Sequence, residues 1–214
     1  MIGLLGGTFD PIHLGHLRLA QALSAALKLS TVRFIPAAVP PHRPQPQASA
    51  HQRAYMVSLA IAAYPEFMLD TRELQRDGPS YTVNTLQALR AELGQHVSLC
   101  LLLGQDAFAG LAGWHHWQTL LEYGHIVIAT RPDSETHDYS AELQRWHDAH
   151  HVSALELLRE QPAGCIYHQA IPALPVSATA IRAALAKGEA VDACLPGAVL
   201  DYIRAEQLYL NRPC

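Results

Sequence analysis

The sequence is poor in cysteine, and the cysteines that it has are far apart. Cys100, Cys165, Cys194 and Cys214 are its only four, and no two of them form a Cys-x-x-Cys pair. A zinc ribbon or a disulfide-rich scaffold needs closely spaced cysteines. The pattern fits neither class, and we expect reduced thiols in a cytoplasmic protein.

Charged residues and long apolar runs are also scarce. Only 16% of the 214 residues are charged and the formal net charge is −4, which argues against binding to nucleic acid or to a membrane surface. No run approaches the roughly 20 apolar residues of a membrane-spanning helix. The first apolar run lacks a basic flank and breaks at Gly6-Gly7, unlike a signal peptide. Half of the residues are hydrophobic, so a sizeable core is expected.

Short apolar runs alternate with longer helical patterns. The runs predict strands at 2–5, 32–35, 67–69, 98–103, 125–129 and 165–167. They lack polar alternation, which indicates strands covered on both faces, as in a parallel sheet. Helical patterns lie near 14–28, 50–63, 82–93, 106–122, 141–160, 178–187 and 196–208. This order predicts an α/β protein with a doubly wound parallel sheet, in one domain over 1–214 with a small C-terminal helical segment at 178–214.

The one proline-rich stretch, residues 36–47, directly follows a predicted strand. In an open α/β sheet, loops at the carboxyl ends of strands line the ligand crevice. We therefore interpret 36–47 as a loop of the site, with an ordinary solvated loop as the alternative. Arg43 in this loop, and Arg131 after the strand at 125–129, follow strands as site residues should.

The segment 6–16 reads GGTFDPIHLGH, between a predicted strand and a predicted helix. Gly6 and Gly7 would let backbone amides approach a ligand, and Thr8 offers a hydroxyl. The start of the following helix favours phosphate through its unpaired N–H groups and its dipole. The spacing matches neither GxGxxG nor GxxxxGK[ST], so both of those nucleotide-binding motifs are excluded.

His13 and His16 lie at the start of that helix and leave three interpretations open. They could donate hydrogen bonds to phosphate, ligate a metal, or pair with the local backbone or a carboxylate. A metal site needs further ligands, and the HExxH pattern is absent.

Two stretches resemble motifs of the nucleotidylyltransferase superfamily. GGTFDPIHLGH is similar to its signature GxFDPxHxGH, and VSATAIR at 176–182 is similar to its ISSTxIR, with Ala178 in place of a serine. The resemblance implies a Rossmann-like fold and nucleotidyl transfer, in which His13, His16 and Arg182 act on the triphosphate. It also implies ATP-binding roles for Gly6, Gly7, Thr8, Phe9, Gly104, Asp106, Ser177 and Thr179. Taken alone, Asp106 also suits a helix cap.

Four further stretches resemble the bacterial nicotinate-mononucleotide adenylyltransferases. They are VPPHRP (39–44), RELQRDGPSYTVNTL (72–86), LLGQDAF (102–108) and GWHHWQTLL (113–121). The resemblance implies that ATP and nicotinate mononucleotide give deamido-NAD and pyrophosphate, in NAD biosynthesis. The implied acceptor-binding residues are Tyr81, Thr82, Trp114 and His115. From their positions after strands, Arg43 and Arg131 could also reach the acceptor phosphate, with a surface arginine as the alternative. Trp114 would stack on the pyridine ring, whereas Trp117 suits core packing.

His115 departs from the tyrosine often found after this tryptophan in close relatives, which leaves the preference for nicotinate over nicotinamide open. We expect Mg²⁺ to be bound mainly through the ATP phosphates, with no metal site on the protein. A homo-oligomer is compatible with the sequence. Transfer to nicotinamide mononucleotide or phosphopantetheine is the alternative within the enzyme class. A non-catalytic metal- or nucleotide-binding module that uses the 13 histidines is the alternative outside it.

Overall fold

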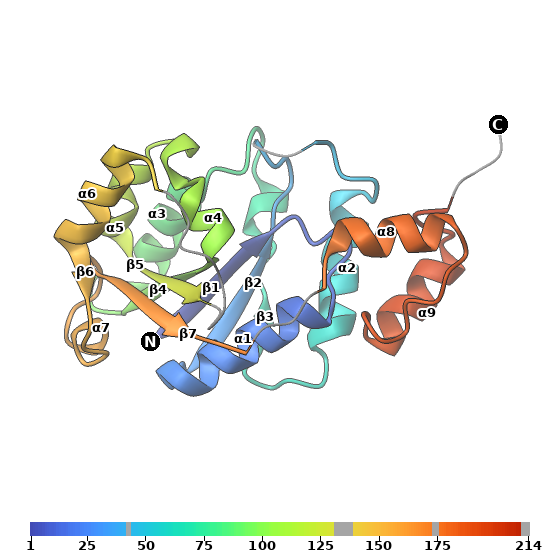
Figure 1. The fold of residues 1–214 in the computed structure, drawn as a ribbon, viewed down its shortest axis with the longest axis horizontal. Helices are drawn as coiled ribbons and strands as arrows, with labels where there is room; N and C mark the ends of the chain where they lie inside the picture. The colour runs from blue at the N-terminus through green and yellow to red at the C-terminus, as the bar shows by residue number, and fades with distance from the viewer. Residues whose placement is uncertain (42–43, 131–138, 173–175, 211–214) are drawn as a thin grey trace.

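The computed structural model describes residues 1–41, 44–130, 139–172 and 176–210, which are built around one sheet (Figure 1). Within these residues all seven strands run parallel, in the spatial order β3-β2-β1-β4-β5-β7-β6. The strands are β1 (Ile2–Gly7), β2 (Thr31–Pro36), β3 (Phe67–Leu69), β4 (Leu99–Gly104), β5 (His125–Thr130), β6 (His151–Val152) and β7 (Ile166–Ala170).

Helices cover both faces of the sheet. They are α1 (Leu14–Leu27), α2 (Ala50–Ile61), α3 (Thr82–Leu93), α4 (Gln105–Ala109), α5 (Leu120–Tyr123), α6 (Ala141–His150), α7 (Leu157–Glu160), α8 (Ala178–Ala186) and α9 (Gly197–Ala205), with 3₁₀ turns η1 (Arg72–Gln75), η2 (Leu111–Gly113) and η3 (Trp117–Thr119). Successive strand residues enter opposite cores: Leu5 and Leu102 pack with α1, α2, α8 and α9, while Leu4 and Leu101 pack with α3, α5 and α6. The predicted doubly wound parallel sheet is confirmed.

Helix α1 begins where the opening motif ends. It buries Leu17, Ala20, Leu23 and Leu27, whose spacing of three and four residues places them on one face of the helix. This packing against the sheet fixes the axis of α1 and so fixes its first turn. The start of α1 consequently lies directly after the turn that follows β1.

Strands β1 and β4 are neighbours, but their pairing stops before either strand ends. It extends only to Leu4 and Leu101. Beyond that point β1 continues against β2 as far as Gly7, and β4 continues against β5 as far as Gly104. The strand order runs outward from β1 in one direction and from β4 in the other. This split is therefore the switch point at which open α/β sheets bind ligands.

The prediction of a single helix over 106–122 is wrong. Helix α4 ends at Ala109, and the 3₁₀ turns η2 and η3 separate it from α5. Gly110 and Gly113 interrupt the helical stretch, and glycine is a poor helix former. Beyond them Trp117 is buried against Trp146 of α6, with the ring centroids 4.9 Å apart. The core position of Trp117 is confirmed.

The helix expected over 141–160 is also interrupted. Helix α6 ends at His150, and residues His151–Val152 form β6, which pairs with Ile166 and Tyr167 of β7. An uncovered strand edge exposes unpaired backbone groups, and a short additional strand pairs with some of them. The local helical pattern could not reveal this pairing, because β7 lies far along the sequence.

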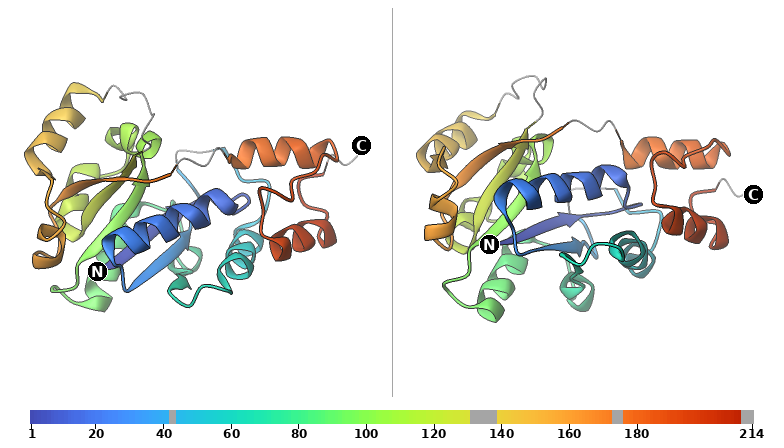
Figure 2. Two further views of the ribbon diagram at one scale, coloured as in Figure 1. Left: turned by 60° about the horizontal axis from the view of Figure 1, so that its bottom comes forward. Right: turned by 90° about the horizontal axis from the view of Figure 1, so that it is seen from below.

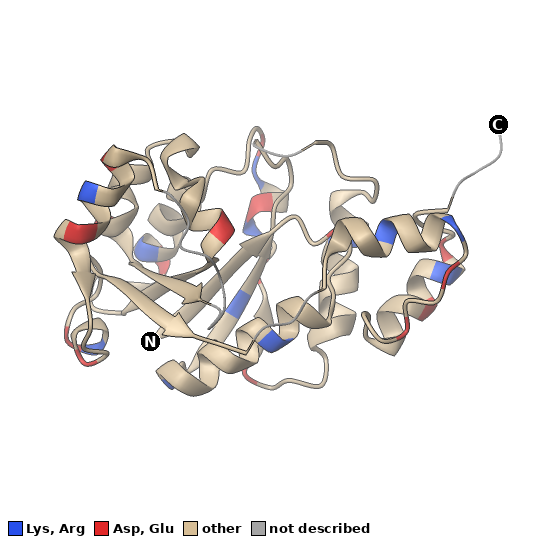
Figure 3. Ribbon diagram, in the orientation of Figure 1, with Lys and Arg blue, Asp and Glu red and all other residues tan. Residues whose placement is uncertain are grey.

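The C-terminal helices α8 and α9 lie beyond one end of the sheet, beside α2 and the start of α1 (Figures 1 and 2). Figure 3 shows Lys and Arg interspersed with Asp and Glu over the described ribbon. Among the described residues, no helix has both the length and the apolar character needed to cross a bilayer.

Candidate active site

The strand ends at the switch point are open. An ideal Cβ built on Gly6 or on Gly104 meets no other described heavy atom within 4 Å, apart from chain neighbours. Gly7 differs, because a Cβ there would lie 3.0 Å from the ring of Phe9. Phe9 is buried and has a left-handed φ of 51°. The segment expected to approach a nucleotide therefore combines open backbone with a tight turn.

His13 and His16 form a stacked pair at the start of α1. Their ring centroids are 3.7 Å apart with an interplanar angle of 22°, and Phe9 meets His16 edge-on at 5.0 Å. The backbone N–H of His13 donates to Nδ1 of His16 at 3.3 Å. An N–H can only donate, so Nδ1 of His16 is unprotonated and its proton lies on Nε2. His16 therefore makes the expected hydrogen bond with backbone through Nδ1, and its Nε2–H can still donate to a ligand.

Both imidazoles are neutral at pH 7 in the ligand-free protein. Burial lowers the pKa of His13 to about 4. Burial, together with the adjacent His13 ring, holds the pKa of His16 well below its usual value. Nδ1 of His13 is buried and makes no hydrogen bond within the described residues. An unpaired buried polar atom is costly, which is expected where a ligand supplies the missing partner.

Gly15 makes room for the His13 ring. A Cβ on Gly15 would lie 2.9 Å from His13 Nδ1 and 3.4 Å from the Cβ of Val176. The glycine thus lies against both the first histidine and the segment that enters α8. The reason for a glycine within the HLGH motif is therefore steric.

The two halves of the predicted triphosphate site meet at this point. Ser177 is the N-cap residue of α8, and its side chain makes no capping hydrogen bond. Arg182, one turn into α8, donates from Nη1 to the carbonyl oxygen of Asp10 at 2.7 Å and from Nη2 to Thr179 Oγ1 at 3.4 Å. The N–H of Leu14 in α1 donates to Cys194 O at 2.9 Å. Two helix N-termini, each favourable to anions, therefore converge from opposite ends of the sequence.

Asp10, which the sequence analysis did not single out, connects three segments of the site. Its carboxylate accepts from the N–H groups of Gln47 and Ala48 at 2.9 and 3.1 Å, and from the Tyr209 hydroxyl at 2.8 Å. Burial and the Asp10 charge raise the pKa of Tyr209. Both carboxylate oxygens are thus occupied, and Asp10 fixes the turn, the proline-rich loop and the C-terminal segment together.

Arg53 is a second residue that the sequence reasoning missed. It is 1% exposed and donates to Ala48 O at 3.2 Å, to Ala38 O at 3.2 Å and to Thr8 O at 2.5 Å. The sequence pattern could have identified it, because Arg53 lies on the face of α2 that otherwise buries apolar residues such as Val57. Together with Asp10 it holds the described part of loop 36–47 against the opening motif, where a site loop was expected.

Two of the predicted acceptor residues, Tyr81 and His115, are in contact. Tyr81 is the N-cap of α3, and its ring stacks on His115 with centroids 4.2 Å apart and an interplanar angle of 27°. Thr82 begins α3, and Trp114 is half-buried at the end of η2. His115 therefore packs against the SYT segment, which a histidine can do with its flat ring.

Three predicted residues need separate comment. Asp106 is the second residue of α4, whose N-cap is Gly104, so the helix-cap interpretation is wrong and the sugar-binding role stays a prediction. Arg43 and Arg131 lie outside the described residues, and their roles stay predictions as well.

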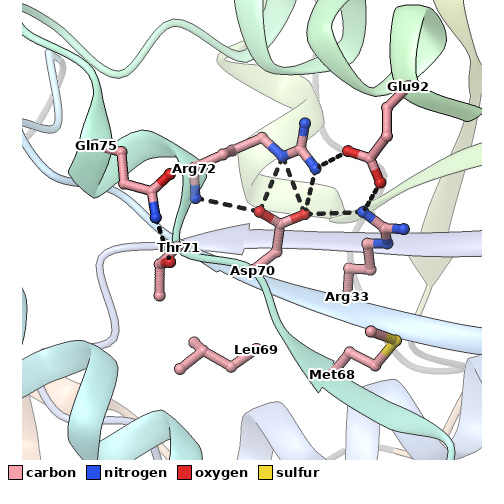
Figure 4. Close-up of a pocket in the computed structure, with 8 residues that line it drawn as sticks. All are labelled: Arg33, Met68, Leu69, Asp70, Thr71, Arg72, Gln75 and Glu92. Carbon is pink, nitrogen blue, oxygen red and sulfur yellow. Dashed lines mark hydrogen bonds and ion pairs between the residues drawn. The ribbon is translucent and has the colours of Figure 1, made fainter.

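A separate hollow of about 440 Å³ lies at the β3 edge of the sheet (Figure 4). Asp70 accepts from Arg33 and Arg72 at 3.1 and 2.8 Å, and Glu92 accepts from the same two arginines at 3.1 and 2.6 Å. Figure 4 shows both guanidinium groups between the two carboxylates. The four charges balance within the protein, and none of the residues that line this hollow is a predicted site residue.

Within the described residues, no group of three or more His, Cys, Asp or Glu side chains is arranged to hold a metal ion. His13, His16 and Arg182, which follow β1 and meet at the starts of α1 and α8, carry N–H donors. Since both Asp10 oxygens already accept hydrogen bonds, the donor set fits an anion better than a cation.

Comparisons with known proteins agree with this geometry. The family described as cytidylyltransferase-like matches residues 4–184. The chain is 51% identical over 201 residues to a Halorhodospira halophila protein named "Probable nicotinate-nucleotide adenylyltransferase", covering 92% of this chain and 90% of that protein. It is 45% identical over 209 residues to a Yersinia pestis protein of the same name, covering 98% and 95%.

A solved structure, the Plasmodium falciparum nicotinic acid mononucleotide adenylyltransferase complexed with NaAD, has a TM-score of 0.72 to this chain. Its sequence is 18% identical, and the match covers 97% of this chain and 96% of the other. At that identity the likeness establishes the fold alone. The sequence relatives and the family match establish more: the chain belongs to the cytidylyltransferase-like family and, within it, to the nicotinate-nucleotide adenylyltransferases.

Proposed function

We propose that the protein transfers the adenylyl group of ATP to nicotinate mononucleotide, giving deamido-NAD and pyrophosphate, as a step of NAD biosynthesis. The observation that carries this proposal is the convergence of the α1 and α8 N-termini at the switch point, where His13, His16 and Arg182 provide N–H donors. The names of the relatives at 45–51% identity support the choice of acceptor.

The triphosphate binds across the two helix N-termini. Gly6, Gly7, Thr8 and Phe9 form the turn beneath it, and the N-terminal end of α8 contributes its N-cap residue Ser177 together with Thr179 and Arg182. Arg182 uses two of its five N–H donors on protein groups, so the others remain for β- and γ-phosphate oxygens. Gly104 and Asp106, at the end of β4 and the start of α4, border the nucleotide sugar.

The acceptor's 5′-phosphate attacks the α-phosphorus in line with the departing pyrophosphate. A phosphate monoester is largely dianionic at pH 7, because its second pKa is about 6, so it needs no general base. The neutral His13 and His16 rings contribute N–H donors, and the arriving negative charge raises their pKa and strengthens those bonds. The rate enhancement then comes from positioning and charge stabilisation.

Magnesium fits this arrangement only through the substrate. The side chains around the proposed triphosphate site are hydrogen-bond donors, and the Asp10 oxygens are occupied by protein donors. Mg²⁺ carried on ATP phosphates would reduce the negative charge that the acceptor phosphate meets. What the protein itself does is to hold the phosphate oxygens with His13, His16, Arg182 and backbone N–H groups.

The pyridine ring and its carboxylate bind between the SYT segment and the loop at Trp114. The Tyr81–His115 stack forms one wall, the Trp114 ring packs on the pyridine face, and backbone amides near Thr82 receive the carboxylate. Arg43 and Arg131 would pair with the acceptor phosphate.

A pyrophosphate-release assay with ATP and one acceptor at a time tests the proposal. We expect rapid release with nicotinate mononucleotide, and kcat/KM at least about tenfold lower with nicotinamide mononucleotide, because amide dipoles favour a carboxylate. Phosphopantetheine should give no release above background. A higher kcat/KM for either of the other acceptors would overturn the assignment of the acceptor, and release with none of them would overturn the activity.

A further inference from the structure

Tyr209 is a buried tyrosine that has no part in the proposed reaction. The residue is 8% exposed, and its hydroxyl donates to Asp10 Oδ1 at 2.8 Å, across 199 positions of the sequence. Burial, together with the negative charge of Asp10, raises the pKa of Tyr209, so the phenol keeps its proton and remains a donor. A residue that follows α9 is therefore bonded to the turn that precedes α1.

The backbone at Tyr209 has an unusual conformation. Helix α9 ends in a Schellman cap, in which Leu208 N–H donates to Ile203 O at 3.0 Å. That cap accounts for the left-handed φ of 51° at Gln207 but not for the φ of 63° at Tyr209. A bulky residue rarely adopts this region, and it stays there only where its surroundings hold it. The buried Tyr209 ring and its hydrogen bond to Asp10 supply that restraint.

Asp10 is also the residue that Arg182 contacts. Arg182 Nη1 donates to the carbonyl oxygen of Asp10 at 2.7 Å and lies 4.0 Å from the carboxylate oxygen Oδ2. Tyr209 bonds the other carboxylate oxygen, and the N–H groups of Gln47 and Ala48 also donate to the carboxylate. These donors set the orientation of the Asp10 carboxylate, and Arg182 lies close enough to respond when that orientation changes.

We propose that Tyr209 is a positioning residue of the nucleotide half-site, the part of the crevice proposed to bind ATP, and that it acts through Asp10 on Arg182. This inference rests on the proposed function, in which Arg182 binds β- and γ-phosphate oxygens. The Tyr209 hydroxyl holds the carboxylate, so Arg182 stays on the Asp10 carbonyl and keeps other N–H donors for the nucleotide. Without the hydroxyl, the carboxylate can turn and form the two-bond pair that arginine and carboxylate favour. Those N–H donors are then lost to the phosphates.

The first test compares Tyr209→Phe with Tyr202→Phe. Each exchange removes one hydroxyl and keeps the ring, but Tyr202 lies on α9 with its ring against Tyr55, at a centroid distance of 4.8 Å. Loss of a hydrogen bond to a charged group should raise KM for ATP about tenfold in Tyr209→Phe, while KM for nicotinate mononucleotide stays within about twofold. Tyr202→Phe should leave both constants unchanged. An unchanged KM for ATP in Tyr209→Phe would overturn the proposal, and so would equal increases in both KM values, because a general loss of structure affects both substrates.

Asp10→Asn tests whether the effect passes through Asp10. Asparagine has one acceptor oxygen in place of two, so it cannot hold both residues 47–48 and Tyr209 as the carboxylate does. If Tyr209 acts through Asp10, adding Tyr209→Phe to Asp10→Asn raises KM for ATP by less than about twofold. Multiplied effects in the double variant would show that Tyr209 acts independently and would overturn the proposal. Should Asp10→Asn fail to fold, Arg182→Lys replaces it in the same comparison, because lysine lacks the planar fork of donors.

Calorimetric titration with MgATP gives a readout that needs neither the acceptor nor the reaction. The dissociation constant should rise about tenfold in Tyr209→Phe and stay at the wild-type value in Tyr202→Phe. An unchanged dissociation constant in Tyr209→Phe refutes the proposal. A wild type that binds MgATP but transfers the adenylyl group to none of the acceptors refutes only the proposed function. A wild type that binds no MgATP refutes both.

Discussion

Two histidine clusters in this protein look alike and are connected differently. At the start of α1, His13 and His16 stack with ring centroids 3.7 Å apart. At the far edge of the sheet, His147, His151 and His168 lie with centroids 5.0 to 5.3 Å apart. Burial lowers the pKa of His13 to about 4 and, with the neighbouring histidines, lowers that of His168 to about 4. Proximity and a lowered pKa therefore do not distinguish the pair proposed to act on the triphosphate from the cluster at the edge of the sheet.

The two clusters differ in the hydrogen-bond partners of their ring nitrogens. His147 Nδ1 bonds the Asp148 carboxylate at 2.9 Å, and His147 Nε2 bonds His168 Nε2 at 2.7 Å. The first of these bonds lies within α6, and the second joins α6 to β7. In the other pair, His16 uses Nδ1 on its own helix start and keeps Nε2–H as a donor. Ligand binding is expected where imidazole nitrogens remain available at the carboxyl ends of strands, as they do after β1.

The largest expected effect comes from removing the donors of the first pair. His16→Ala or His13→Ala should lower kcat about 100-fold or more, as loss of a donor that stabilises transition-state charge does, while KM for ATP changes much less. The measurement is steady-state pyrophosphate release. The matched variant His168→Ala removes an imidazole of equally low pKa and should leave kcat within about twofold. Comparable decreases in kcat in His13→Ala and His168→Ala would show that the two histidine clusters do not differ in their contribution to turnover.

A smaller effect is expected from displacing the His13 ring without removing it. Gly15→Ala puts a methyl group 2.9 Å from His13 Nδ1, so the ring must rotate away, and we expect kcat to fall about tenfold with little change in Tm. Gly197→Ala is the control, because Gly197 begins α9 and a Cβ there meets nothing within 4 Å. A Gly15→Ala enzyme with wild-type kcat would mean that the position of the His13 ring does not matter.

The sequence alone predicted much of this arrangement, for physical reasons that can be named. Apolar runs and helical periodicity are local properties, so the strand at 67–69 and the helix at 82–93 have the predicted bounds. The opening motif and VSATAIR carry side chains whose chemistry is evident from residue type. Their expected meeting is present in the hydrogen bond from Arg182 to the Asp10 carbonyl, and a Cβ built on Gly15 would lie 3.4 Å from the Cβ of Val176.

What the sequence could not predict depends on contacts between distant residues. The pairing of Asp10 with Tyr209 spans nearly the whole chain, and no local pattern marks either residue as a partner. Likewise, His147 and His151 fall within the helix expected over 141–160, and only the placement of β7 brings His168 to them. The break at His151 follows from edge-strand pairing, which is a tertiary effect.

The second cluster should contribute to stability and not to turnover. His168→Ala removes the hydrogen-bond partner of His147 Nε2, and an unpaired, largely buried polar group costs about 1–3 kcal/mol. We expect the free energy of unfolding in urea to fall by that amount. His96→Ala, at an exposed position between α3 and β4, should change it by less than about 0.5 kcal/mol. An unchanged unfolding free energy in His168→Ala would show that the cluster does not hold α6 to β7.

The smallest expected effect is on the pH dependence of the unfolding free energy, to which the two clusters contribute separately. A histidine whose pKa falls on folding binds its proton more readily in the unfolded chain, so stability is complete above pH 6.5 and declines as the pH falls towards the folded value of about 4. His168 is half-buried, so its share is only a fraction of the roughly 1.4 kcal/mol per pH unit that one full proton contributes.

The measurement is the free energy of unfolding in urea at pH 7 and at pH 5.5. The decrease from pH 7 to pH 5.5 should be smaller in His168→Gln than in the wild type, because glutamine keeps a hydrogen-bonding side chain but cannot titrate. His13 contributes in the same direction through its own lowered pKa, so the acid-side loss should persist in part. A His168→Gln protein as acid-sensitive as the wild type would show that His168 does not contribute to the acid-side loss, and would leave that loss to the other buried histidines with a lowered pKa, His13, His16 and His125.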